Sequence, residues 1–238
     1  MSYRILILIG VVAAMVGLFS MLPNSSTTES NSGWSIRASS PEVIGGYGDN
    51  VCYDGHGVQT LSGSLDLVIK LDGTGSIDAT ISTSDGVGSL HPASSGELAG
   101  TLRLVSRIDP SSEVREDVDV NGDVAGGDPN FPQTHALLAG KSAFDVYVDG
   151  KLLYENLLGE WSLADAVRQS DGSIRQSGLV YSPLLREKSG FSDPKRLEFT
   201  LLLHSDLLDA ENKPPYSIVL HLVFSDVTVE KQPSRSRQ

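Results

Sequence analysis

Apolar residues recur at every second position through much of the chain, and this period favours extended strands over helices. Over residues 64–71 the apolar side chains share one face, and after Asp-Gly-Thr-Gly the alternation resumes over residues 76–82. Two such runs around a glycine-rich turn predict a β-hairpin. A second hairpin is predicted where segments 143–148 and 151–154 flank Asp149-Gly150.

Further candidate strands cover residues 101–108, 179–181, 196–204 and 216–229. Short strands separated by Gly, Pro and Asp turns predict a mainly β protein, and 24 glycines in 238 residues supply many turns. The expected fold is therefore an antiparallel β-sandwich or a jelly-roll-like body.

One segment departs from this alternation. Ser162 is followed three residues later by Asp165, as in a capping box, and apolar residues at 163, 164 and 167 recur at helical spacing. The sequence predicts one short helix here, which ends before Ser-Asp-Gly at 170–172.

The N-terminus carries 18 consecutive uncharged residues at positions 5–22, between Arg4 and Pro23. As a helix they would span about 27 Å, close to the hydrocarbon core of a bilayer. They predict a single transmembrane helix that acts as a signal-anchor, with the N-terminus cytoplasmic and the body outside the cytoplasm. The alternative is a cleaved signal peptide and a secreted protein, although no Ala-x-Ala cleavage site follows.

These patterns divide the chain into four parts. Residues 1–23 form the membrane segment, and residues 24–40 read as a flexible stalk rich in Ser, Thr and Asn. Residues 41–230 form the predicted extracytoplasmic β-sandwich domain. Residues 231–238 are a basic tail without apolar residues, which we expect to be disordered.

Charge and cysteine content exclude several classes of partner and site. The net charge is −12 and the pI is about 4.7, whereas a nucleic-acid partner requires a basic surface. Cys52 is the single cysteine of the chain, which excludes an intrachain disulfide and any site built from several cysteines.

An acidic loop at 117–128 is the sharpest local motif. Gly122 permits a tight turn at the sixth position, and Ca²⁺ takes six to eight oxygen ligands. The candidate calcium ligands are Asp117, Asp119, Asn121, Asp123 and Asp128. Over these twelve residues the loop resembles the calcium loop of EF-hand and dockerin proteins, which implies calcium as a cofactor. The alternative is a solvated acidic turn, because Asp, Asn and Gly are the usual turn residues.

Other polar residues gave weaker candidates. If the last two long strands pair with His204 near Ser217, then His204 and His221 share a face about 13 Å apart, too far for one metal. Arg168, Arg175 and Arg186 concentrate positive charge that could hold a carboxylate or pair with local acids.

No known catalytic motif occurs, so the chain is more simply read as a non-enzyme. The first hypothesis is a membrane-anchored extracytoplasmic binding or accessory module, whose partner outside the cytoplasm is a protein or a carbohydrate. The second is a calcium-stabilised structural or adhesive surface domain. The third is an exported hydrolase without a recognisable motif.

Overall fold

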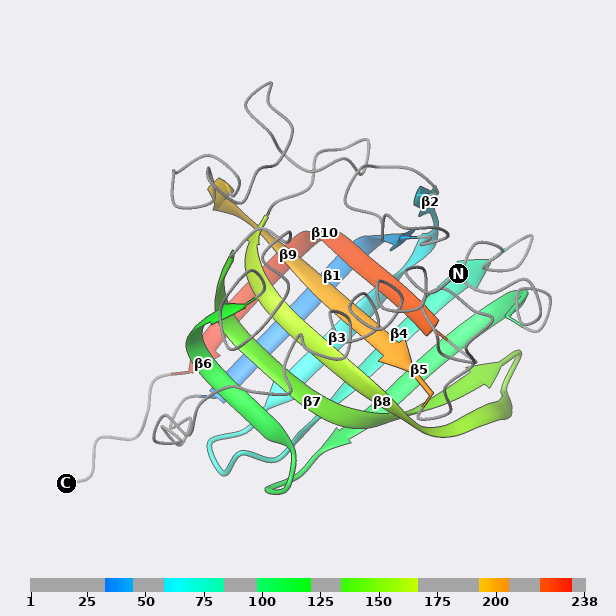
Figure 1. Ribbon diagram of the computed structural model, residues 1–238, viewed down its shortest axis with the longest axis horizontal. Coiled ribbons are helices and arrows are strands. Elements are labelled where there is room, and N and C mark those ends of the chain that lie inside the picture. The colour runs from blue at the N-terminus through cyan, green and yellow to red at the C-terminus, as the bar shows by residue number, and fades with distance from the viewer. Residues whose placement is uncertain are drawn as a thin grey trace, which may run out of the picture.

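The computed structural model describes residues 33–44, 58–83, 98–120, 134–166, 193–205 and 219–232. These residues form one antiparallel sheet that closes on itself as an eight-stranded barrel (Figure 1). The strands in chain order are β1 (Gly33–Ile44), β2 (Val58–Thr60), β3 (Ser62–Ile69), β4 (Gly75–Thr83), β5 (Gly100–Ile108), β6 (Glu113–Val120), β7 (Thr134–Val148), β8 (Lys151–Ala166), β9 (Asp193–His204) and β10 (Val219–Gln232).

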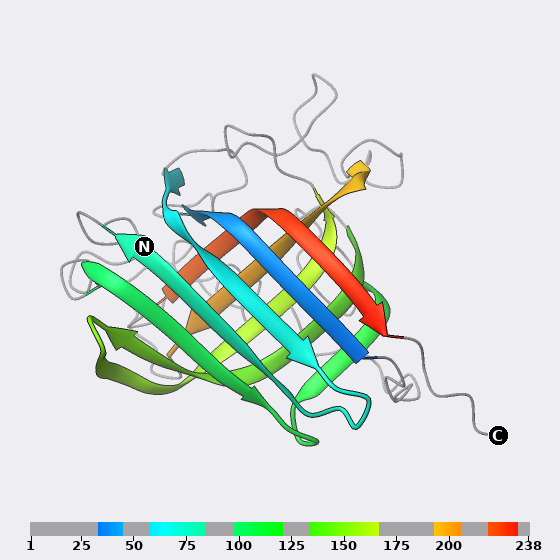
Figure 2. The same cartoon turned by 180° about the vertical axis from the view of Figure 1, so that it is seen from behind.

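The prediction of a mainly β, antiparallel protein is confirmed, but the predicted sandwich or jelly roll is wrong. The barrel order is β10-β9-β8-β7-β5-β4-β3-β1, and β1 pairs with β10 over ten residue pairs to close the ring (Figure 2). β2 pairs with β1, and β6 pairs with β7, outside this ring. A sandwich needs two sheets, whereas here a single sheet closes on itself through the β1–β10 pairing.

Both predicted hairpins are confirmed. β3 and β4 pair from Ser62↔Ser82 to Ile69↔Gly75, and the Asp72 carboxylate accepts hydrogen bonds from the backbone N–H and the hydroxyl of Thr74. At the β7–β8 turn, Asp149 and Gly150 have φ of 48° and 80°, the left-handed conformation that a two-residue hairpin loop needs.

The predicted helix after Ser162 is corrected: the described residues contain no helix, and this segment is the end of β8. Leu163 faces the barrel interior beside Trp161, and Ser162 pairs with Thr200 of β9. Burial against neighbouring strands has overridden a weak local helix pattern. The candidate strand at 179–181 lies outside the described residues.

Two strands extend into the segments predicted as stalk and tail. β1 takes in residues 33–40 of the predicted stalk, and β10 takes in residues 231–232 of the predicted tail. Trp34, Ile36 and Ala38 are buried at alternate positions, while the Ser-rich positions between them face outward. Because its outward-facing residues are polar, the composition of this segment did not indicate a strand.

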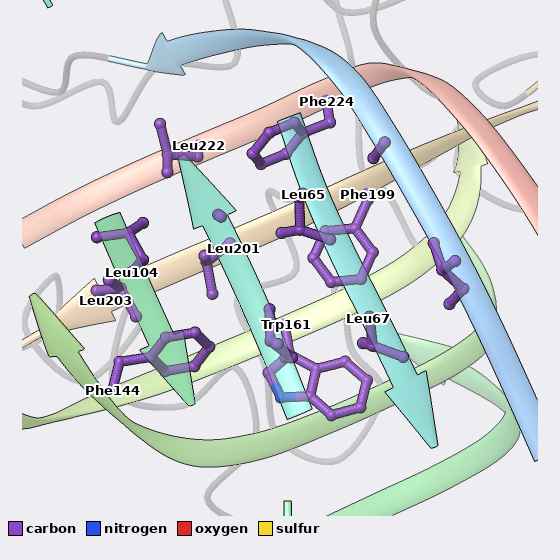
Figure 3. Close-up of a cluster of buried hydrophobic side chains, with 14 of the residues drawn as sticks. Leu65, Leu67, Leu104, Phe144, Trp161, Phe199, Leu201, Leu203, Leu222 and Phe224 are labelled. Carbon is purple, nitrogen blue, oxygen red and sulfur yellow. The ribbon is translucent and has the colours of Figure 1, made fainter. Parts of the chain in front are cut away.

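Large apolar side chains fill the barrel interior (Figure 3). The ring of Phe199 stacks on Trp161 at 6.3 Å between centroids and meets Phe224 edge to face at 6.4 Å. Two hydroxyls share the interior: Ser106 and Ser142 hydrogen-bond at 2.8 Å, and the Trp161 indole N–H donates to Ser142 at 3.2 Å. The wide side chains and paired polar groups make a packed core, so a ligand site is expected on the outside of the barrel.

Glycines make room for these rings. A Cβ on Gly140 would overlap the Trp161 ring, and one on Gly159 would overlap the Phe144 ring. The two glycines therefore set the diameter at which the wall can close around an aromatic core.

The predicted membrane segment at 5–22 lies outside the described residues. Within the described ranges, no helix is long and apolar enough to cross a bilayer.

Candidate functional site

The barrel wall is not continuous between β9 and β10. The two strands pair over six residue pairs, from Val219↔His204 to Phe224↔Phe199, and no described pair continues beyond them. From residue 225 onward β10 follows β1, while the first half of β9 follows β8 (Figures 1 and 2). We call residues 194–197 of β9 and 225–228 of β10 the seam.

On the β9 side, a bulge opens the seam. Asp193 pairs with Ala166 of β8 and Leu197 pairs with Asp165, so the register of the β8–β9 ladder shifts between these two pairs and β9 bulges over residues 194–196. Pro194 has no backbone N–H to donate, which explains why the ladder breaks at this point. The bulge carries Lys195 and Arg196, both exposed.

On the β10 side, the seam opens where the alternation of inward-facing and outward-facing residues shifts by one position. The buried positions of β1 change from 34, 36 and 38 to 41, and those facing the core in β10 change from 220, 222 and 224 to 227 and 229. Both changes occur between the pairs Ser39↔Asp226 and Pro41↔Phe224, and Ser40, which lies between them in β1, has φ of 54°. The Ser40 hydroxyl donates to the Asp226 carboxylate at 2.5 Å and holds this kink.

The end of β10 is joined to β6 through the Glu116 carboxylate. One oxygen of this carboxylate accepts a hydrogen bond from the Trp34 indole at 2.8 Å, and the other pairs with Lys231 Nζ at 2.9 Å. Lys231 also lies over the Trp34 ring, 4.2 Å from its centroid. These contacts tie the start of β1 and the end of β10 to β6.

An open cleft of about 770 Å³ lies at the seam, a volume within the range of small-ligand sites. Its described lining comes from β1, β3, β9 and β10 and consists of Arg37, Ala38, Ser39, Ser64, Leu65, Asp66, Lys195, Arg196, Leu197, Ser225, Asp226, Val227 and Thr228. Hydroxyl and charged side chains dominate this set.

The charge of the cleft differs from that of the chain. Its described lining holds three cations, Arg37, Lys195 and Arg196, against two carboxylates, whereas the whole chain has 18 Lys and Arg against 30 Asp and Glu. Arg37 Nε lies 3.3 Å from the Asp66 carboxylate, an exposed pair, and Asp226 is engaged by Ser40. The cleft is thus a locally cationic site on an acidic protein.

A second unusual feature is the buried carboxyl of Glu160, on the outer face of β8. The side chain is 6% exposed, and Oε1 accepts from Lys141 Nζ at 2.9 Å. Oε2 is buried without a hydrogen-bond partner in the described part of the chain. Burial raises the pKa of Glu160, and the charges of Lys141 and His204 oppose that rise.

The predicted calcium ligands are only partly described. Asp117 and Asp119 lie on β6, where their carboxylates face His135 of β7: Asp119 Oδ1 is 3.5 Å from Nδ1, and Asp117 Oδ1 is 4.0 Å from Nε2. Asn121, Asp123 and Asp128 lie outside the described ranges. Over those ranges, no three His, Cys, Asp or Glu side chains group as a metal site would require, so calcium binding has no support there.

The predicted register of the two histidines is corrected. His204 pairs with Val219 rather than Ser217, which places His221 opposite Leu202. The two imidazoles are therefore diagonal neighbours on adjacent strands, closer than the predicted 13 Å. The length of the segment between the two strands does not fix their register, so the sequence could not give this pairing.

Sequence patterns missed the cleft residues, although two signals were present. Asp-Pro-Lys-Arg at 193–196 places a proline and two cations at the start of a strand, which is typical of a broken ladder. The change of apolar phase between Phe224 and Val227 is the signature of an irregular strand. Arg168, Arg175 and Arg186, which the sequence suggested as a cationic patch, lie outside the described residues.

Comparison of the chain with family models, with curated protein sequences and with solved structures found no match in any of the three. The function is therefore inferred from the residues and geometry of the barrel.

Proposed function

We propose that this protein is a binding module whose ligand site is the cleft at the seam and whose ligand is anionic. The observation that carries the proposal is the reversal of charge: cations outnumber acids in the cleft of a chain with a net charge of −12. Local positive charge steers an anion to one place on a surface that otherwise repels it.

The filled interior also supports an external site. Barrels that carry a small ligand inside leave space between their walls, whereas here Phe144, Trp161, Phe199 and Phe224 occupy the centre. The seam, in contrast, contains an open cleft in the wall of the barrel.

The location stays a prediction from the sequence. An acidic binding module outside the cytoplasm agrees with the apolar segment at 5–22, which lies outside the described residues. The hydrolase hypothesis gains little, because the carboxyl with a raised pKa, Glu160, is buried against Lys141.

The test is a titration of the full-length protein with poly-L-glutamate, followed by tryptophan fluorescence or calorimetry. We expect binding that weakens as ionic strength rises from about 0.01 M to about 0.15 M, because the Debye length falls from about 30 Å to about 8 Å. The double variant Lys195→Glu/Arg196→Glu should weaken binding by about tenfold or more.

The matched control is Lys151→Glu, a charge reversal at an exposed position of β8 beside the β7–β8 turn. It should leave the affinity within about twofold, because β8 contributes no residue to the described lining of the cleft. Equal losses in the control and the double variant would point to net charge alone and would reject the cleft as the site.

A further inference from the structure

The seam exposes the edge of a strand as well as a cleft. Residues 226–228 of β10 pair with β1 on one side, and no described residue of β9 pairs with residues 225–228 on the other. An extended strand alternates its N–H and C=O groups between its two sides, so the outer side of this stretch presents donors and acceptors to the cleft.

We propose that the anionic ligand of the cleft is an acidic polypeptide segment that binds in extended form and adds a strand along β10. This inference rests on the proposed function, and it assigns the class of ligand and the mode of binding. Strand addition to an exposed edge is a general mode of peptide recognition, in which main-chain hydrogen bonds supply affinity and side chains supply specificity.

The two sides of the seam have different roles. β9 and β10 are antiparallel, so a strand inserted between them is antiparallel to one and parallel to the other. The β9 side is broken by the bulge at 194–196 and cannot supply a regular ladder. β10 therefore provides the ladder, and the β9 bulge provides cationic side chains from Lys195 and Arg196.

The dimensions limit the bound segment. A strand rises about 3.3 Å per residue, so residues 225–228 present roughly 13 Å of edge, the length of about four residues of an added strand. Arg37 lies in the same row as Thr228 across β1 and β10, on the outer face of the wall. An acidic residue paired beside Thr228 would have its carboxylate on that face, which Arg37 shares.

The test compares peptides of about eight residues that alternate glutamate and threonine, added to the full-length protein labelled with ¹⁵N. The first peptide is unmodified. The second carries N-methyl groups on alternate amides along one edge, which removes the ladder donors but keeps every charge. The third has lysine in place of glutamate, and citrate serves as an anion without a peptide backbone.

We expect the unmodified acidic peptide to bind and to slow amide hydrogen exchange at residues 225–228. N-methylation on the edge that faces β10 and the lysine sequence should each weaken binding by about tenfold or more. Lys195→Glu/Arg196→Glu should weaken binding of the acidic peptide by a similar factor, with Lys151→Glu as the control.

The outcomes separate the two proposals. If the methylated and unmodified peptides bind equally, strand addition is wrong and an anion site remains. If neither the acidic peptides nor citrate bind, the proposed function is wrong as well. If the outward amides at 225–228 are already protected in the free protein, another segment of the chain occupies the edge and the inference is overturned.

Discussion

Two parts of the barrel differ in the regularity of their antiparallel strand pairing. In the wall of β3, β4 and β5, β3 and β4 pair without interruption from Ser62↔Ser82 to Ile69↔Gly75, and β4 and β5 pair from Gly75↔Ile108 to Thr83↔Gly100. Buried and exposed positions alternate closely along these strands. In the seam half, formed by β8, β9 and β10, the ladder breaks at 194–196, the phase of β10 changes, and charged groups are buried on the outer face.

Departures from regular structure weaken a fold, and they are kept where function requires them. The wall shows what the chain needs in order to close a barrel around an apolar core. The seam half holds Lys195, Arg196 and a strand edge in one cleft, at the cost of an incomplete ladder. This difference is the physical reason to place the ligand site at the seam.

The largest expected difference is in the stability lost when one ion pair is broken in each half of the barrel. Lys141→Met leaves the buried Glu160 carboxylate without its cation and should lower the free energy of unfolding by about 3–5 kcal/mol. Arg103→Met removes the partner of Asp78 in the wall, where both side chains are about half exposed, and should lower the stability far less, because water screens an exposed ion pair. Urea denaturation of both variants measures the two losses.

Similar losses for Lys141→Met and Arg103→Met would contradict the distinction between a buried and an exposed pair. Combining Lys141→Met with Glu160→Gln should recover part of the loss, because the unpaired charge is then removed.

The next difference concerns apolar packing. Ile77→Ala in β4 creates a cavity at a fully buried position and should cost about 2–5 kcal/mol. Val227→Ala in β10 removes a partly buried side chain beside the cleft and should cost about 1 kcal/mol. Thermal unfolding followed by circular dichroism checks the order, and a larger loss at Val227 would show that the seam is as tightly packed as the wall.

Much of the wall could be predicted from its residues. Alternation places Leu65, Leu67 and Ile69 on one face, and Asp149-Gly150 encodes a tight turn; both depend on local interactions. Closure into a barrel could not be predicted, because β1 pairs with β10 across nearly the whole chain. No local pattern distinguishes that pairing from the two-sheet alternative.

The cleft could be predicted only in part. Pro194 and the cations that follow it indicate an interrupted strand, but they do not predict which strand lies opposite. The kink at Ser40 depends on a residue in a Ser-rich segment, and the position of Lys231 depends on Glu116, 115 residues away. Such contacts are tertiary and leave no periodic trace in the sequence.

A smaller effect concerns pH. The raised pKa of Glu160 means that the folded protein holds this proton at pH values where the unfolded chain, with a pKa near 4.5, has lost it. This group stabilises the fold fully below the unfolded pKa, and the contribution is lost as pH rises through the folded pKa. Glu160→Gln should remove that part of the pH dependence, measured as urea stability from about pH 4 upward. An unchanged pH profile in the variant would show that the carboxyl is not buried as described.

The most direct test of an open seam is residue-specific amide hydrogen exchange in the free protein. In β4, which pairs on both sides, we expect every backbone amide from Ser76 to Ser82 to be protected. Along residues 225–228 of β10, protection should alternate, with slow exchange at amides that face β1 and fast exchange at those that face the cleft. Uniform protection at 225–228, equal to that in β4, would contradict the open seam and the ligand site placed there.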